Sequence, residues 1–369
     1  MTFKLGFFKY RAWRSFLVLI VVLSVNSAEA QIKTEWLDTS NTPAQHELGH
    51  FFTNRKPILN EEGEVVSFKN RWIRQTKSLY FCRYDFDADS VIPKYLATKT
   101  CSKKTFPTEP VDNNFLYQVY QDLRIENGIR NFVFVIPGHA KTFEKQLHDW
   151  MFRLQHSYAD SLRNTAFITF AWSSEPIGPL YYRGLRAADR SSNDFAIFQH
   201  MLESFVADSS FWERHPFDIS IKLVSTSMGN ELFRRYLIKR EYQGIPLVQV
   251  YDRIILIGSD APANSFDKGE AFSHLLEMTP SILVLVNRRD GPLTLSQVMN
   301  LEGRLGRVGP TNRTELPDNI VVRDVTNLID WGDLTTLGHD YFLRNEVLKD
   351  YILHEELSSE LPSGIEVKE

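Results

Sequence analysis

Six short runs of mostly apolar residues recur along the chain from residue 130 onward. They are NFVFVI (131–136), AFITFAW (166–172), ISIKLVST (219–226), RIILIG (253–258), SILVLV (281–286) and NIVVRDV (319–325). Continuous runs of this length are typical of strands that are buried on both faces, as in a parallel sheet. The pattern therefore predicts six strands of one buried sheet.

Between these runs the apolar positions recur every three to four residues. Segments 142–158, 193–208 and 230–242 each place such residues on one face, which predicts amphipathic helices. Strands that alternate with helices indicate an α/β fold, with a mostly parallel central sheet flanked by helices. In such a sheet the ligand site lies beyond the carboxyl ends of the strands.

We place the α/β core at residues 130–355, and the segments on either side of it lack this alternation of strand and helix patterns. Residues 31–129 form an N-terminal extension with the first strands, irregular in its sequence up to 113, and 78–86 is its one clear strand. Residues 356–369 are acidic and poor in apolar residues, and we expect this tail to be disordered.

The first thirty residues read as a bacterial signal peptide. A basic front precedes the apolar run FLVLIVVLSV (16–25), and AEA (28–30) is a small-x-small cleavage pattern before Gln31. The run is shorter than the ~20 residues of a spanning helix. We expect export to the periplasm or medium and no stable membrane span after cleavage; an uncleaved anchor is the alternative.

Charge and cysteine content narrow the function classes. The 369 residues carry a net charge of −4, and removing 1–30 takes away four basic residues and one acidic residue, which leaves −7. A mildly acidic chain without a basic stripe is not expected to bind nucleic acid. Cys82 and Cys101 are the only cysteines, and in an oxidising compartment they predict a disulfide. Two buried free thiols are the alternative.

The stretch LVSTSMGNEL (223–232) has the strand–turn–helix pattern that presents a nucleophilic serine, G-x-S-x-G. Ser227 is the candidate nucleophile, Gly229 fits the pattern, and Ser225 replaces its first glycine. The backbone N–H of Met228 at the helix start would face a developing oxyanion. A serine in an ordinary structural turn is the alternative.

The groups that follow come in the order of an α/β-hydrolase triad, which is serine, acid, histidine. Asp290 follows the strand at 281–286, and His339 lies in a loop after the strand at 319–325. The turn after the first core strand supplies Gly138 and His139 as candidates for the second oxyanion donor. These groups each follow a strand, so the fold would gather them at one edge.

From about 130 to 350 the chain resembles a bacterial α/β-hydrolase family of uncharacterised function with esterase- and lipase-like members. The matching segments are FAWSS (170–174), TSMGN (226–230), DAPANSF (260–266), RDGPLTLS (289–296), GRLG (303–306) and GHDYF (338–342). The resemblance implies an α/β-hydrolase fold and a triad of Ser227, Asp290 and His339. The family typically has histidine before the serine and a His-Gly-Tyr-Asn-like sequence after the early strand. Here these positions hold Thr226 and PGHA (137–140), so the departures concern the oxyanion loop and the substrate pocket.

Two acidic residues have competing interpretations. Asp260 follows the strand at 253–258 and is the alternative acid, because hydrolase folds also take the acid from that strand. Its structural interpretation is a loop carboxylate at the rim of the site. Asp340, next to His339, is equally consistent with a helix cap.

Two other segments offer further sites. HELGH (46–50) matches a zinc-peptidase motif, in which one helix would point His46 and His50 at a metal with Glu47 as base. Gly49 and Pro57 weaken such a helix, and no further glycine–histidine continuation follows. Residues 172–194 read as a long loop over the pocket, with Trp172, Tyr181 and Tyr182 as wall candidates, or as a packed surface loop.

Together these patterns predict an exported serine hydrolase that cleaves an acyl bond, most simply a carboxylic ester, of a small molecule through an acyl-enzyme. No cofactor or metal is required by this chemistry. The alternative of a different class is a non-catalytic binding or envelope-associated protein on a hydrolase fold, since a fold does not guarantee a function.

Overall fold

The computed structural model describes residues 48–69, 78–85, 90–98, 114–139, 142–147, 164–174, 181–329, 337–345, 348 and 351–352. Residues 1–30, for which a signal peptide is predicted, Gln31 and the tail 356–369 lie outside these ranges. No helix among the described residues is long and apolar enough to cross a membrane.

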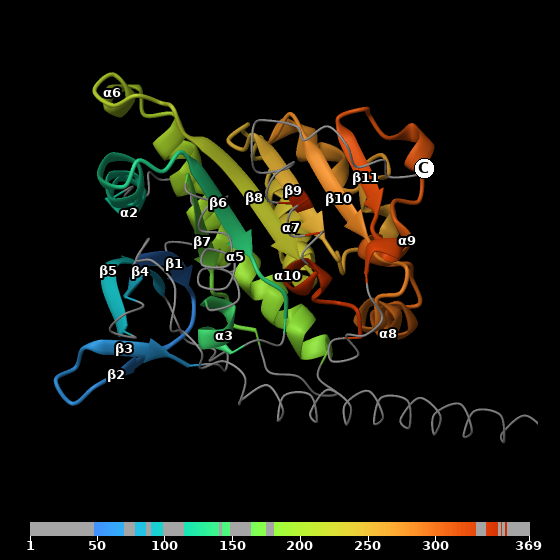
Figure 1. The fold of residues 1–369 in the computed structure, drawn as a ribbon, viewed down its shortest axis with the longest axis horizontal. Helices are drawn as coiled ribbons and strands as arrows, with labels where there is room; N and C mark the ends of the chain where they lie inside the picture. The colour runs from blue at the N-terminus through green and yellow to red at the C-terminus, as the bar shows by residue number, and fades with distance from the viewer. Residues whose placement is uncertain are drawn as a thin grey trace, which may run out of the picture.

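One nine-stranded sheet forms the centre of the molecule, in the order β11-β10-β9-β8-β6-β7-β1-β4-β5 (Figure 1). All six predicted core strands are present. They are β6 (Asn131–Ile136), β7 (Thr165–Phe170), β8 (Ser220–Thr226), β9 (Arg253–Ile257), β10 (Ile282–Val286) and β11 (Ile320–Asp324). Neighbours among these six pair in parallel. The predicted α/β fold with a mostly parallel sheet is confirmed.

The N-terminal extension completes this sheet, where the sequence indicated one strand only. β1 (Leu48–Thr53) pairs in parallel with β7 and antiparallel with β4 (Ser78–Asp85), which in turn pairs antiparallel with β5 (Ser90–Thr98). A separate hairpin joins β2 (Pro57–Leu59) to β3 (Val65–Phe68).

The helices cover both faces. The long ones are α5 (Tyr181–Val206) and α7 (Met228–Tyr242), with α2 (Asn114–Tyr120), the π-helical turn η2 (Gln121–Glu126) and α6 (Ser209–Trp212) near one end. Shorter elements are α3 (Phe143–Leu147), α8 (Gly291–Asn300), α9 (Leu305–Val308) and α10 (Tyr341–Arg344). Short 3₁₀ turns are η4 (Ala263–Phe266), η5 (Ala271–Glu277), η6 (Arg313–Glu315) and η7 (Thr326–Leu328).

The structure corrects the prediction for residues 172–194, whereas the described part of the helix predicted at 142–158 is helical. The segment 172–194, expected to be a long loop, is helical from Tyr181 onward because α5 begins there and not at 193. Its inward face is built from small buried residues, among them Gly184, Ala187, Ala188 and Ser191, which let the helix pack closely. Of the helix predicted at 142–158, the described part is α3.

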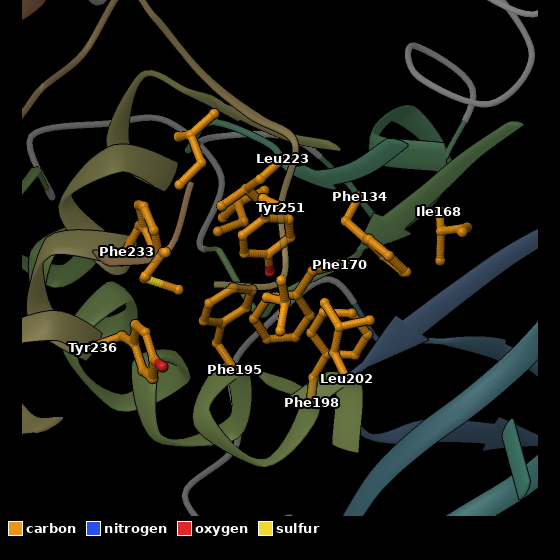
Figure 2. Packing of buried hydrophobic residues seen from close by; sticks show 14 of the residues in the cluster. Phe134, Ile168, Phe170, Phe195, Phe198, Leu202, Leu223, Phe233, Tyr236 and Tyr251 are labelled. Atoms are coloured by element: carbon orange, nitrogen blue, oxygen red, sulfur yellow. The ribbon is translucent and has the colours of Figure 1, made fainter. Parts of the chain in front are cut away.

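The core explains why the strand sequences are apolar without alternation. Phe134 of β6 faces the larger cluster with α5 and α7, whereas Val133 and Val135 face a second cluster that includes Tyr341 of α10. Figure 2 shows the larger cluster, in which Phe195 of α5 packs toward the sheet residues. Both faces are therefore buried, and each fully buried large side chain contributes about 2–3 kcal/mol.

The predicted disulfide is not present in the structure. Cys82 lies in β4 as a free, buried thiol within a small apolar cluster that contains Phe51, Phe68 and Phe143. Burial raises the pKa of this thiol, so it behaves as an apolar core residue. Cys101 lies outside the described residues.

Candidate active site

Ser227 lies in the sharp turn between β8 and α7. Its backbone has φ 51° and ψ −127°, a conformation that non-glycine residues rarely adopt and that costs about 1–3 kcal/mol. The turn is held on both sides, since Ser227 N–H donates to Ile257 O at 2.9 Å and Ser227 O accepts from Asp260 N–H at 3.1 Å. This geometry is the strained strand-to-helix turn of a nucleophile elbow.

Close packing of α7 against β6 accounts for the second glycine of the pattern. A Cβ at Gly229 would lie 2.4 Å from Ile136 O and 2.8 Å from Pro137 O, so any larger residue would clash with backbone. Ser225, in contrast, is an ordinary residue of β8 that pairs with Ile136 and has no positive φ. Its hydroxyl is buried and makes no hydrogen bond within the described residues. The missing first glycine therefore does not prevent the turn.

Ser227, His339 and Asp290 form a continuous chain of hydrogen bonds. His339 Nε2 lies 2.8 Å from Ser227 Oγ, and His339 Nδ1 lies 2.6 Å from Asp290 Oδ2. The sequence predicted these residues in this order, and the fold brings them together at the carboxyl ends of the strands. In Figure 1 the arrowheads of β6, β8 and β10 point to the end of the sheet where α8, α9 and α10 lie.

Asp290 also begins α8. Its Oδ1 accepts from Leu293 N–H at 2.8 Å, which satisfies one free amide of the helix start. One carboxylate thus caps the helix with one oxygen and faces the imidazole with the other, and its side chain is fully buried.

The loop that carries His339 is fixed to the loop that carries Asp290. Leu337 and Gly338 precede the histidine with φ 51° and 72°, which turns the chain back toward the site. Leu337 O accepts from Gly291 N–H at 3.0 Å, and Gly338 O accepts from Asn287 Nδ2 at 2.7 Å. Both bonds hold His339 at a fixed place relative to the acid.

The electrostatics favour a proton on His339. Burial lowers the pKa of the imidazole, but the charge and hydrogen bond of Asp290, with smaller contributions from Asp340 and Asp260, raise that pKa to about 9. The site therefore stabilises an imidazolium, the species that forms when the histidine accepts a proton from a serine.

The candidate oxyanion donors surround Ser227. Met228 is the first residue of α7, and a Cβ at Gly138 would lie 2.8 Å from Ser227 Cβ, so the loop after β6 approaches the serine as closely as glycine allows. Trp172 Nε1 donates to Pro137 O at 2.7 Å and anchors this loop. In the described part of the chain, no hydrogen bond uses the amide of Met228 or of His139.

The His139 side chain plays a different part from its amide. The imidazole packs against Gly184 of α5, where a Cβ would lie 2.7 Å from His139 Cε1. Burial lowers the pKa of His139 to about 4, so the ring is neutral at pH 7. The ring therefore packs between the loop after β6 and α5, and the backbone N–H of His139 is the part that stays a candidate oxyanion donor.

Asp260 has no hydrogen bond to the imidazole among the described residues and is not the partner of His339. Its buried carboxylate accepts from Tyr181 OH at 3.0 Å and from Ser296 Oγ, and Arg304 Nε lies 3.6 Å away. Burial raises the pKa of Asp260 to about 6 against the opposing effects of these neighbours.

The remaining sequence candidates are also placed. Trp172 is fully buried, so it supports the oxyanion loop and does not line an open pocket. Tyr182 is half exposed and donates to Met299 O at 3.0 Å. Asp340 occupies the N-cap position of α10, but its side chain accepts no capping hydrogen bond.

The zinc-peptidase alternative requires both histidines of HELGH on one helix, and the structure contradicts this. His50 lies in strand β1, not on a helix, and its Nε2 is 3.0 Å from Asp122 Oδ2. No cluster of three or more metal-binding side chains occurs among the described residues. His46 and Glu47 lie outside them.

The sequence did not reveal three residues whose side chains hydrogen-bond to backbone groups near Ser227 and His339. Asn287 holds the histidine loop, Asn230 Nδ2 donates to Ser225 O at 3.0 Å, and Tyr341 OH accepts from Gly258 N–H at 3.1 Å. Asn230 and Tyr341 lie in segments that match the family, close in sequence to Ser227 and His339. This closeness is the sequence signal that could have pointed to them.

The fold and the site define an α/β-hydrolase. Residues 117–356 match the family described as "Alpha/beta hydrolase of unknown function (DUF900)". Because the match spans more than half of the chain, the protein belongs to this family, which confirms the resemblance. A comparison with curated proteins found no match.

Solved structures give distant matches. The lin2722 gene product of Listeria innocua is 13% identical over 63% of this chain and 96% of its own, with a TM-score of 0.29. The RedJ thioesterase of the prodiginine biosynthetic pathway in Streptomyces coelicolor is 13% identical over 68% and 88%, with a TM-score of 0.28. The AtxE2 isopeptidase is 12% identical over 81% and 54%, with a TM-score of 0.29. Likeness at this level carries no argument about substrate.

Proposed function

We propose that this protein is a serine hydrolase that cleaves an acyl bond, most simply a carboxylic ester, through Ser227, His339 and Asp290. The observation that carries the proposal is the hydrogen-bond chain from Ser227 Oγ to His339 Nε2 at 2.8 Å and from His339 Nδ1 to Asp290 Oδ2 at 2.6 Å. It occurs at a serine whose backbone is held in a rare conformation at the helix start.

In the proposed reaction Ser227 Oγ attacks the acyl carbonyl carbon while its proton moves to His339 Nε2. Asp290 accepts a hydrogen bond from Nδ1–H throughout, which fixes the tautomer and stabilises the imidazolium. The backbone N–H groups of Met228 and His139 donate to the oxyanion of the tetrahedral intermediate.

Collapse of that intermediate breaks the bond to the leaving group, which takes the proton from His339 and departs. A water molecule then gives its proton to the freed Nε2 and attacks the acyl-enzyme carbonyl. The second tetrahedral intermediate expels Ser227, which recovers its proton from the imidazolium. The products are a carboxylic acid and the alcohol or other leaving group, and the enzyme returns to its first state.

Two further features of the site favour an active hydrolase over a non-catalytic binding protein with the same fold. A binding protein on this scaffold does not need a glycine at 138 to bring the loop after β6 against Ser227, or a buried acid facing a histidine. We also propose that the substrate is a small acyl compound outside the cytoplasm, on the basis of the signal segment 1–30.

A fluorophosphonate probe tests the proposal directly. The base that activates a serine toward a carbonyl also activates it toward phosphorus, whereas an unassisted hydroxyl stays protonated and weakly nucleophilic. We expect intact-mass analysis to show one adduct that maps to Ser227. The adduct should be absent in Ser227→Ala and strongly slowed in His339→Ala.

Ser225→Ala is the matched control. It removes a buried hydroxyl two residues before Ser227, in β8, and this hydroxyl makes no hydrogen bond within the described chain. Its labelling should match that of the unaltered protein. A folded protein that forms no adduct after prolonged exposure to excess probe would refute the catalytic proposal.

A further inference from the structure

Asp260 is a buried charged group next to the nucleophile that the proposed reaction does not use. It follows β9, and its backbone N–H donates to Ser227 O at 3.1 Å. Its side chain is 4% exposed, and its carboxylate accepts from Tyr181 OH and Ser296 Oγ. A buried carboxylate is costly unless it is well partnered, so this arrangement needs an explanation.

The partners of Asp260 belong to the elements that build the site. Ser296 lies on α8, the helix whose N-cap is Asp290. Tyr181 is the first residue of α5, and it also accepts from Asn300 Nδ2 of α8 at 3.0 Å. Asp260 therefore joins three parts: the Ser227 turn, the helix that carries the acid, and the start of α5.

Its charge is also placed where it acts on the histidine. The acids that raise the pKa of His339 are Asp290, Asp340 and Asp260, against the lowering effect of burial. The pKa of Asp260 is itself raised by burial and by Glu231 of α7, and it is lowered by Arg304, Ser296 and Tyr181. A pKa of about 6 leaves Asp260 ionised at neutral pH. Among the described residues it makes no hydrogen bond to the imidazole, whose partners are Asp290 and Ser227.

We propose that Asp260 is a positioning residue for the hydrolase reaction. Its backbone and carboxylate fix the Ser227 turn to the helix that begins with Asp290, and its negative charge favours the imidazolium of His339 that forms as Ser227 attacks. This inference rests on the proposed function, since it assigns a role within that reaction. A preorganised charge near a developing opposite charge lowers the barrier without reorganisation during the reaction.

The test is the pH dependence of fluorophosphonate labelling in Asp260→Asn. Asparagine keeps the shape and can still accept a hydrogen bond, but it removes the charge. Labelling requires neutral His339, so the rate rises with pH through the imidazole pKa. We call the pH at which the labelling rate reaches half of its plateau the half-rise. Loss of a nearby negative charge lowers the pKa of the imidazole, so the half-rise should move down by on the order of half a pH unit. A directly paired charge would shift it by about one to three units. We also expect a plateau rate several-fold lower.

Two variants separate charge from packing. Tyr181→Phe removes a hydrogen bond to the carboxylate but leaves its charge, so the half-rise should not move. Asp252→Asn removes a carboxylate at the opposite end of β9, where Oδ2 accepts from Ile221 N–H at 3.0 Å. That position is a five-residue strand away, roughly 17 Å, so this variant should also leave the half-rise unchanged. A purely structural role predicts slower labelling in Asp260→Asn without any shift.

If Asp260→Asn does not fold, Arg304→Gln gives the opposite test. It removes the cation 3.6 Å from Asp260 Oδ1, so the negative charge acts on His339 unopposed and the half-rise should move up. An unchanged or lowered half-rise in that variant would overturn the proposal.

A second measurement distinguishes a failure of the Asp260 role from a failure of the proposed hydrolase function. NMR titration of the His339 imidazole does not depend on turnover. If the unaltered protein resists the probe, the proposed function fails, and the assigned role fails with it. If it reacts but Asp260→Asn shows the same half-rise and the same His339 titration, the role of Asp260 alone is overturned.

Discussion

Asp290 has two structural roles that a pair of substitutions separates. Its Oδ1 caps α8 through Leu293 N–H at 2.8 Å, and its Oδ2 faces His339 Nδ1 at 2.6 Å. Asparagine caps helices as well as aspartate does. Asp290→Asn therefore retains the helix start and removes the charge beside the imidazole, whereas Asp290→Ala removes both.

The magnitude follows from the pKa of His339. Burial lowers the pKa of His339, whereas Asp290 and, to a smaller extent, Asp340 and Asp260 raise it. The net effect is a rise of this pKa from 6.5 to about 9. A shift of ~2.5 units corresponds to about 3 kcal/mol in favour of the charged ring. Because the pKa is raised in the folded state, this stabilisation is fully present below about pH 6.5 and is lost as the pH rises through about 9.

Urea unfolding at about pH 6, 8 and 10 measures this effect. The stability advantage of the unaltered protein over Asp290→Asn should be largest at the lowest pH and should shrink by about 3 kcal/mol toward the highest. Asp290→Ala should lose a further ~1 kcal/mol at every pH because the cap is gone. Probe labelling of Asp290→Asn should fall steeply, since the corresponding change in a serine-protease triad lowers kcat ~10⁴-fold. A stability difference that does not change with pH would refute the reasoning.

Four further outcomes are expected. Gly229→Ala should destabilise the protein by about 3 kcal/mol in thermal or urea unfolding, because the new Cβ meets the backbone of β6. Leu301→Gly should stabilise it by roughly 0.5–1 kcal/mol, since Leu301 is 81% exposed with φ 57° at the end of α8, and relief of a left-handed leucine outweighs the added chain entropy of glycine. Labelling and ester hydrolysis should survive strong chelation, and loss with recovery on added zinc would contradict the serine mechanism. N-terminal sequencing of exported protein should begin at Gln31, and an intact Met1 would contradict signal cleavage.

The parallel core and the proximity of Ser227, Asp290 and His339 could be predicted because both depend on short-range patterns. Strands β6 to β10 are almost fully buried on both faces, so their sequences are mostly apolar, whereas β11 at the edge of the sheet is partly exposed. Ser227 directly follows β8, and Asp290 and His339 lie in the loops after β10 and β11. Position after a strand is enough to predict proximity when all the strands point the same way. Asp290 was separable from Asp260 only in three dimensions, because both follow strands and only Asp290 reaches His339 Nδ1.

The parts that could not be predicted depend on contacts between distant segments. β1 contains Gly49 and His50, which weaken any local strand signal, and it is stabilised by pairing with β7 and β4. The first turns of α5 contain Gly184 and the pair Ser191–Ser192, which read as loop residues. They are buried in a helix because Gly184 fits against His139 and Ser191 Oγ accepts from Asn54 Nδ2 at 2.9 Å. Tertiary packing outweighs local propensity in such segments.

The departure from the G-x-S-x-G pattern at Ser225 has a physical explanation. The first glycine of a nucleophile elbow is useful where strand and helix approach too closely for a side chain, and here the close approach is concentrated at Gly229 and Gly138. Ser225 instead remains within β8, where its buried hydroxyl makes no hydrogen bond in the described chain, at a cost of about 1–3 kcal/mol. Glycine at this position would remove that cost, so the serine does not relax the turn. The strained conformation of Ser227 and the close approaches at Gly138 and Gly229 are both present with serine at position 225. Backbone strain of this kind is concentrated at functional sites, so it supports the proposed role of Ser227 as the nucleophile.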